Sequence, residues 1–410
     1  MIEQLMQAVG CEKWPERWNT LYPEVVADFE KNGCPYLLDA YYDTLKSDYG
    51  ITFVHESLYR EAASLVRKNR DLSLFAALVC RAMRDRATAY DEVLGCQMPK
   101  PAAGTHDLAL EMLEALIIFS EIPYAFTTMK KQGLPESHIR FMIGKLEGGV
   151  TAYEDRHGAP GYAHLYWNQL IIDGKLHRIG RLELEIRDNC PAGVSAFENA
   201  NGERVYLADH VKLHKSGYAL GPIFFEDETD AWEANIEETD DAYIGHTFDG
   251  MGYALREKTV LSKSAWRRIL SPTDPVVSIH IPSDGKLKDE DVKETYREMV
   301  RFLATYFPDF HYKAFYCASW LLDPQLEALL GSDSNIVKFG KGFTRFLALD
   351  GGMGVFYFGF KMKHGKLFRD YTIDDLPEHT SLHTKVKDHY RKGKGIYAVS
   401  GVFFTDEIPD

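Results

Sequence analysis

The pattern of apolar and polar residues changes character along the chain. Up to about residue 150, apolar side chains recur every three or four positions, as in 58–66, 75–83 and 108–116, and segments containing Gly or Pro separate these stretches. This spacing is typical of amphipathic helices that bury one face. The pattern therefore predicts a helical N-terminal domain over residues 1–157.

Alternating patterns take over after this region. Residues 176–186 alternate in the manner of a strand, and two further apolar runs flank Asn201–Gly202, a pair that favours a tight hairpin turn. Strands are expected over 176–186, 194–198, 204–207 and 255–261, and short helices over 163–172 and 266–270. These elements predict a mixed, β-rich part over residues 158–270.

The C-terminal third, residues 271–410, gives the clearest pattern. Residues 276–281 (VVSIHI) form a β-branched run typical of a buried strand, and an amphipathic helix with three acids in its first turn follows at 289–307. A second strand is expected at 312–317, and a strand–helix–strand unit of this kind normally joins parallel strands. A short helix is expected over 325–330, and strands over 343–349 and 355–361. The predicted fold class is mixed α/β (α+β), with a helical region ahead of a mixed sheet and flanking helices.

Composition and charge narrow the function classes. The chain has 410 residues, 45% of them apolar, and a formal net charge of −14, which argues against binding to nucleic acid or to an anionic membrane over a broad surface. The sequence contains no apolar run of the roughly 20 residues that a transmembrane helix needs. Its six cysteines form no CxxC pair, and the first residues lack a basic segment ahead of an apolar core. We therefore expect a cytoplasmic protein with reduced thiols and a small-molecule partner, whose oligomeric state the sequence leaves open.

Several long phrases resemble one bacterial family of acyltransferase-domain proteins. They are VVSIHIPSDGKL at 276–287, FPDFHYKAFYCASWLLDPQLEALL at 307–330, SNIVKF at 334–339 and LHRIGRLELE at 176–185. Members of this family combine an N-acyltransferase N-terminal domain with a GNAT-like C-terminal domain. The resemblance implies a GNAT-like sheet and the transfer of an acyl group from a coenzyme A thioester to an amine or hydroxyl. Coenzyme A would then act as a co-substrate, and no tightly bound cofactor is expected.

In the GNAT pattern, the loop after such a strand holds the pyrophosphate of coenzyme A. The resemblance places this loop at 282–288, with Ser283 and Gly285 as contacts. The usual signature of that loop reads Arg or Gln, two residues, Gly, one residue and then Gly or Ala, whereas Gly285 is the only glycine here. The segment 282–291 also holds two Lys and four acids, a charge that would repel a pyrophosphate.

Two residues near the ends of the predicted parallel strands could carry chemistry. His280 is a candidate general base because its unperturbed pKa lies near neutrality, and it could instead simply bond a neighbouring backbone group. Cys317 is a candidate acyl-accepting nucleophile beside that histidine, and it could equally be a buried, inert thiol. Ser319 could protonate a leaving thiolate or bond the acyl carbonyl, or it could cap the next helix.

Other candidates lie further along the chain. Trp320, Asp323 and Asn335 are candidate substrate contacts, although Asp323 at the start of a helix and Asn335 in a turn favour structural roles. The cations Lys338, Lys341 and Arg345 are candidate ligands for the phosphates of coenzyme A.

The sequence contains none of the common hydrolase or nucleotide-binding motifs, and no metal site is predicted. The pairs His379/His383 and His210/His214 lack a third ligand, and no GxSxG, P-loop or dinucleotide fingerprint is present. Two interpretations compete with the acyltransferase. One is a GNAT-like binding or regulatory module that has lost coenzyme A, and the other is a Cys–His acyl enzyme.

Overall fold

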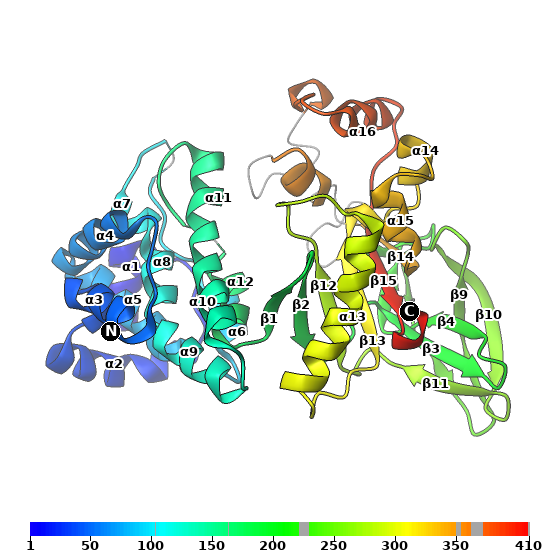
Figure 1. Cartoon of the computed structure of the whole chain (residues 1–410), viewed down its shortest axis with the longest axis horizontal. Helices are drawn as coiled ribbons and strands as arrows, with labels where there is room; N and C mark the ends of the chain where they lie inside the picture. Colours follow the sequence, from blue (N-terminus) through cyan, green and yellow to red (C-terminus); the bar gives the residue numbers. More distant parts are fainter. Residues whose placement is uncertain (103, 163, 221–228, 350–353, 362–371, 409–410) are drawn as a thin grey trace. The chain divides into compact units, whose positions relative to one another are not determined.

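The computed structural model contains two compact units, Met1–His177 and Arg178–Asp410. It describes residues 1–102, 104–162, 164–220, 229–349, 354–361 and 372–408. The fold is mixed, with helices in the first unit and two sheets with flanking helices in the second (Figure 1).

The first unit is a bundle of short helices. Its core is built from the periodic apolar faces that the sequence predicts, as in α5, where Leu74, Phe75 and Leu78 are buried. The helices are α1 Ile2–Val9, α2 Trp18–Asn32, α3 Asp39–Tyr49, α4 Glu56–Lys68, α5 Arg70–Met83, α6 Ala89–Gly95, α7 Leu108–Glu111, α8 Leu113–Phe119, α9 Ile122–Lys131, α10 Glu136–Gly144, α11 Gly148–His157 and α12 Leu165–Ile172.

A nine-stranded mixed sheet forms the centre of the second unit. In spatial order its strands are β1 Leu176–Ile179, β2 Leu182–Arg187, β12 Val276–His280, β13 Ala314–Ser319, β15 Ala398–Phe403, β14 Thr344–Leu349, β6 Ala219–Leu220, β5 Val211–Leu213 and β7 Trp232–Ala234. Strands β12 and β13 are parallel, as the strand–helix–strand pattern predicts, whereas β2 and β15 pair antiparallel on their outer sides. The last strand along the chain, β15, is thus inserted between β13 and β14.

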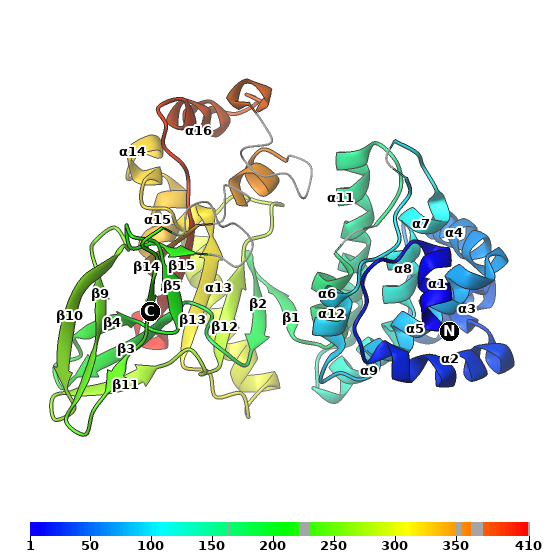
Figure 2. The ribbon, with the colours of Figure 1, turned by 180° about the vertical axis from the view of Figure 1, so that it is seen from behind.

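A six-stranded sheet packs nearby in the same unit. Its path is β10 Ala254–Ser262, β9 Ala242–Phe248, β4 Arg204–Ala208, β3 Val194–Asn199 and β11 Trp266–Leu270, and β8 Glu237–Glu238 pairs with β9. Figure 2 shows these strands grouped on one side of the unit. Buried residues of β3 and β11 share a core with Val276, Tyr316 and Val402 of the long sheet. The second sheet therefore covers part of one face of the first.

Helix α13, Asp289–Tyr306, covers the other face of the long sheet (Figure 1). Its buried side chains Val292, Met299 and Leu303 pack in one cluster with Val277 and Phe315 of the parallel strands. Helices α14 Leu326–Leu330, α15 Asn335–Lys341 and α16 Ser381–Arg391 stand together at one end of the unit around a separate cluster.

Three local predictions are corrected by the structure. The segment predicted as one strand at 176–186 is a hairpin, β1–β2, which turns at Gly180–Arg181. Residues 266–270 form strand β11 rather than a helix, because they pair with β3. Residues Val355–Gly359, predicted as part of a strand, form a π-helical turn, and Val355 and Phe356 pack in the cluster that contains Trp320.

Candidate functional site

The parallel strands β12 and β13 stay paired over only part of their length. Their register joins Val276 to Ala314, Val277 to Phe315 and Ser278 to Tyr316, and it ends there. Beyond this point β12 remains paired to β2 as far as His280, and β13 remains paired to β15 as far as Ser319. The two strands are thus held by their outer neighbours and share no register pair at their carboxyl ends. This unpaired end of β12 and β13 is called the slot.

The end of β13 is exposed on one face of the sheet. Strand β13 lies inside the nine-stranded sheet, and its first four residues are buried. Ala318, the fifth, is exposed, and Ser319 is half-buried. Because side chains of a strand point out of the plane of the sheet, no layer covers this face at the end of β13.

His280 lies at one edge of the slot and is bonded to a buried carboxylate. Its Nε2 lies 2.8 Å from Oε2 of Glu185, whose side chain is 7% exposed, and the His280 side chain is 26% exposed. Strand pairing creates this contact, because Glu185 stands opposite Ser278 and Glu183 opposite His280, which places all four on one face.

Glu185 is held in its ionised form. Burial opposes ionisation, but hydrogen bonds from His280 and Ser278 and the positive charges of His280 and Arg187 outweigh it, so the pKa of Glu185 is lowered. The carboxylate accepts a hydrogen bond from Nε2–H of His280, which fixes the orientation of the ring. The arrangement is that of a general base oriented by an acid.

The structure does not bring Cys317 to His280. Ser278 pairs with Tyr316, so His280 lies on the face of Tyr316, whereas Cys317, one residue further along, points to the opposite face. Cys317 is 1% exposed within the cluster beneath α13, and burial raises its pKa to about 12. The geometry therefore argues against the Cys–His acyl enzyme.

The loop after β12 is bound by two arginines of the β1–β2 hairpin. Arg181 donates hydrogen bonds to the carbonyl oxygens of Pro282 (2.8 Å), Gly285 (2.5 Å) and Lys286 (2.9 Å). Arg178 pairs with Asp284 at 3.1 Å. The two guanidinium groups balance the excess acid that the sequence shows around this loop, so its local charge no longer opposes an anion. Ser283 and Gly285, both predicted contacts, are exposed here.

A glycine makes this hairpin contact possible. Gly180 has φ +48°, and a Cβ at this position would lie 2.5 Å from Oγ1 of Thr295 on α13. The same Oγ1 accepts a hydrogen bond from the backbone N–H of Arg181 at 2.9 Å. The turn is therefore fixed against α13, and Arg181 is held in place beside the loop.

The candidates that follow β13 have mainly structural contacts. The Ser319 hydroxyl accepts a hydrogen bond from the N–H of Leu321, and Trp320 is buried in the cluster with α14–α16. Asp323 is 2% exposed, and its carboxylate accepts hydrogen bonds from the N–H groups of Gln325 and Tyr397. Burial raises the pKa of Asp323 in spite of these bonds. The contacts of Trp320 and Asp323 in the described residues are thus structural, while Ser319 lies at the carboxyl end of β13.

Asn335 and the three predicted phosphate ligands lie in different local environments. Asn335 and Lys338 are exposed on α15, and Lys341 pairs with Glu327 at 2.6 Å. Arg345 on β14 is half-buried, and burial lowers its pKa while Asp323 and Glu327 act against this. Among the described residues, none of these four has a hydrogen bond or ion pair to the loop 282–288.

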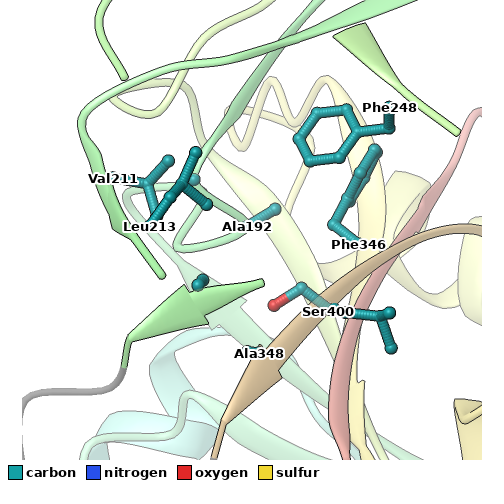
Figure 3. Close-up of a pocket in the computed structure, with 10 residues that line it drawn as sticks. Ala192, Val211, Leu213, Phe248, Phe346, Ala348 and Ser400 are labelled. Carbon is teal, nitrogen blue, oxygen red and sulfur yellow. The ribbon is translucent and has the colours of Figure 1, made fainter. Parts of the chain in front are cut away.

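A small cavity lies on the His280 face of the sheet (Figure 3). It encloses about 10 Å³ between Val211, Leu213, Phe248 and Phe346, and the Ser400 hydroxyl is its one side-chain oxygen. This volume is about the minimum that one water molecule needs, so the cavity is a packing gap and not a substrate site.

The described ranges contain no group of three or more His, Cys, Asp or Glu placed to hold a metal ion. No helix in the described parts of the chain combines the length and apolar character needed to cross a bilayer.

Sequence reasoning missed three residues of this site, namely Arg178, Arg181 and Glu185. The signal for Glu185 was present, because two acids alternate with Leu and Ile in the strand LELEIR. The arginines were hidden because the hairpin turn was not recognised.

Comparisons with known proteins identify a family profile and similar solved structures. The profile of the GNAT-like C-terminal domain matches residues 176–403, more than half of the chain. One similar solved structure is an acyltransferase in complex with decanoyl-CoA and teicoplanin. Its TM-score is 0.62, its sequence is 17% identical, and the alignment covers 99% of each chain. A mutant acyltransferase in complex with octanoyl-CoA has a TM-score of 0.60, at 16% identity and the same coverage. No match was found among curated proteins.

Proposed function

The chain belongs to the GNAT-like C-terminal domain family, and from this premise we propose that it transfers an acyl group from a coenzyme A thioester to an amine or hydroxyl of a small molecule. The observation that carries the proposal is the slot between β12 and β13, with the His280–Glu185 pair at its edge. The similarity in fold to acyltransferases that hold octanoyl-CoA or decanoyl-CoA supports it.

The slot suits the extended arm of a coenzyme A thioester. Strand edges that lose a ladder partner present N–H and C=O groups, and an extended ligand with amide groups can pair with such an edge as an added strand would. The loop 282–288 follows directly from β12 and leads into α13, so the diphosphate would lie at the start of that helix, where backbone N–H groups favour anions.

His280 then acts as the general base. The nitrogen or oxygen of the acceptor attacks the thioester carbonyl carbon and gives its proton to Nδ1 of His280, while Glu185 holds the ring through Nε2. The tetrahedral intermediate collapses, the C–S bond breaks, and coenzyme A leaves as a thiolate that takes up a proton. The products are an amide or ester and free coenzyme A. Backbone N–H groups beside the slot would stabilise the oxyanion.

The related structures suggest which substrates to try first. They contain octanoyl-CoA, decanoyl-CoA and teicoplanin, so medium-chain acyl-CoA donors and small molecules with a primary amine or hydroxyl are the first candidates for this chain. A GNAT-like module without catalysis remains the alternative. Its main support is the missing glycine signature, for which the arginine contacts to the loop offer a substitute.

Release of free coenzyme A tests the proposal. The whole chain is incubated with acetyl-, octanoyl- or decanoyl-CoA and a panel of amines and alcohols, and the thiol released is measured together with the mass of the acylated product. We expect acceptor-dependent release, and we expect His280→Ala to lower kcat by about 100-fold or more. His311→Ala serves as the matched control, because His311 is exposed ahead of the opposite end of β13. Equal loss in both variants, or no change in His280→Ala, would remove His280 as the base.

A further inference from the structure

The contacts of Arg181 determine how the peptide groups of the loop 282–288 are oriented. The guanidinium binds the carbonyl oxygens of Pro282, Gly285 and Lys286, so all three point toward it. In a planar trans peptide the C=O and the following N–H point in opposite directions. The N–H groups of Ser283, Lys286 and Leu287 must therefore point away from Arg181.

These N–H groups make no hydrogen bond to any described residue. They lie just ahead of α13, whose N-cap residue Lys288 makes no side-chain capping bond. Backbone N–H groups at the start of a helix favour anions. The loop thus has donors turned away from Arg181, and this cation holds them in that orientation.

The guanidinium itself is built into the fold. The Arg181 side chain is 8% exposed, and its Nη1 is buried without a hydrogen-bond partner in the described structure, 3.8 Å from Oδ1 of Asp284. A buried guanidinium that lacks one of its hydrogen bonds is costly unless charge is supplied nearby. Asp284 is 59% exposed and pairs with both Arg178 and Arg181, and Asp291 adds a second negative charge near Arg181. The guanidinium is thus held in place by the loop that it orients.

The one glycine of the loop is not responsible for its shape. Gly285 has no positive φ, and a Cβ there would lie 3.5 Å from Nε of Arg181, an ordinary contact distance. An alanine therefore fits, and the conformation must be imposed from outside the loop.

We propose that Arg181 is a positioning residue that turns the N–H groups of Ser283, Lys286 and Leu287 outward to bind the diphosphate of the acyl donor, in place of a glycine-rich loop. The inference rests on the proposed function, because it assumes that the donor is a coenzyme A thioester. It adds that the β1–β2 hairpin, outside the loop itself, determines how tightly the donor is bound.

Donors that differ only in their phosphates test this inference. The values of kcat/KM are measured with acyl-CoA, acyl-dephospho-CoA, which keeps the diphosphate and lacks the 3′-phosphate, and acyl-pantetheine, which lacks both. In Arg181→Met, which keeps an unbranched apolar stem without donors, we expect a loss of at least tenfold with the first two thioesters and little change with acyl-pantetheine. The dissociation constants of CoA and dephospho-CoA, measured by calorimetry, should rise by the same factor.

A control variant isolates the effect. Arg301→Met removes an exposed arginine of α13 that pairs with Glu294, and it should change none of these values. A loss that is equal for acyl-CoA and acyl-pantetheine would overturn the proposal, because it would show a general structural role for Arg181. A loss with acyl-CoA alone would also overturn it, because Arg181 would then act on the 3′-phosphate. A wild-type chain that transfers from none of the three thioesters would instead refute the proposed function, and this inference with it.

Discussion

At the scale of single residues, the contact between Glu185 and His280 couples chemistry to stability. Glu185 has a lowered pKa, so its ionised form is bound more favourably in the folded chain than in the unfolded one. For a carboxyl group with a depressed pKa, this stabilisation is fully present above the unfolded value of about 4.3 and is lost as the pH falls through the folded pKa.

We therefore expect Glu185→Gln to lower the free energy of unfolding at pH 7, by roughly 1–2 kcal/mol, because a charge-assisted hydrogen bond is lost. The difference between wild type and variant should shrink as the pH is lowered from 5 to 3. Denaturant unfolding at several pH values measures it. A difference that stays constant over this range would contradict an ionised Glu185 in the folded chain.

Cys317 gives a second prediction at this scale. With a pKa raised to about 12 and a side chain sealed beneath α13, it should react with iodoacetamide at pH 7.5 far more slowly than the same thiol in urea-unfolded chain. Peptide mapping by mass spectrometry measures both rates. Rapid labelling of native Cys317 would restore the acyl-enzyme hypothesis. Cys317→Ala should keep kcat within about threefold.

Single residues also show what local pattern can and cannot predict. His280 was predicted as a candidate because its place near the end of a buried strand follows from local pattern alone. Its partner was not, because Glu185 lies 95 positions away and meets His280 only through the pairing of β2 with β12. Strand pairing decides which distant side chains share a face, and alternation within one strand does not specify the partner.

At the scale of elements, the unit β12–α13–β13 was predictable because each signal is local. The β-branched run, the acids in the first turn of the helix and its apolar face agree with one another. The helix predicted over 266–270 was wrong for the opposite reason, because pairing with the distant strand β3 makes these residues a strand. The segment Val355–Gly359 has the composition of a strand, but it packs as a π-helical turn in the cluster that holds Trp320. In both cases tertiary contacts override local preference.

The β1–β2 hairpin was also not predicted from local pattern, and this omission hid Arg181. Its turn, Gly180–Arg181, lacks the Asn–Gly or Asp–Gly pair that marks a tight hairpin, so the segment resembled one long strand. Recognising the turn would have placed Arg181 beside the loop 282–288. The loop that lacks the glycine signature is thus the loop whose carbonyl groups Arg181 binds.

At the scale of the whole molecule, the slot is a property of the sheet and of no single strand. It exists because β2 holds β12 and β15 holds β13 beyond the last residue pair that joins the two. The position of β15, the last strand of the chain, inside the sheet cannot be read from local pattern. The family profile covers this entire arrangement, since it extends from 176 to 403.

The central claim is that the slot between β12 and β13 receives a coenzyme A thioester, and calorimetric titration of the full chain with CoA tests it without knowledge of the acceptor. We predict one binding site at micromolar CoA for the wild type, and at least tenfold weaker binding for Ala318→Trp, which fills the exposed end of β13. Ala265→Trp, an exposed alanine ahead of β11 in the second sheet, is the control and should bind as the wild type does. A wild-type chain that gives no binding heat with millimolar CoA, or an Ala318→Trp variant that binds as tightly as the wild type, would contradict the account.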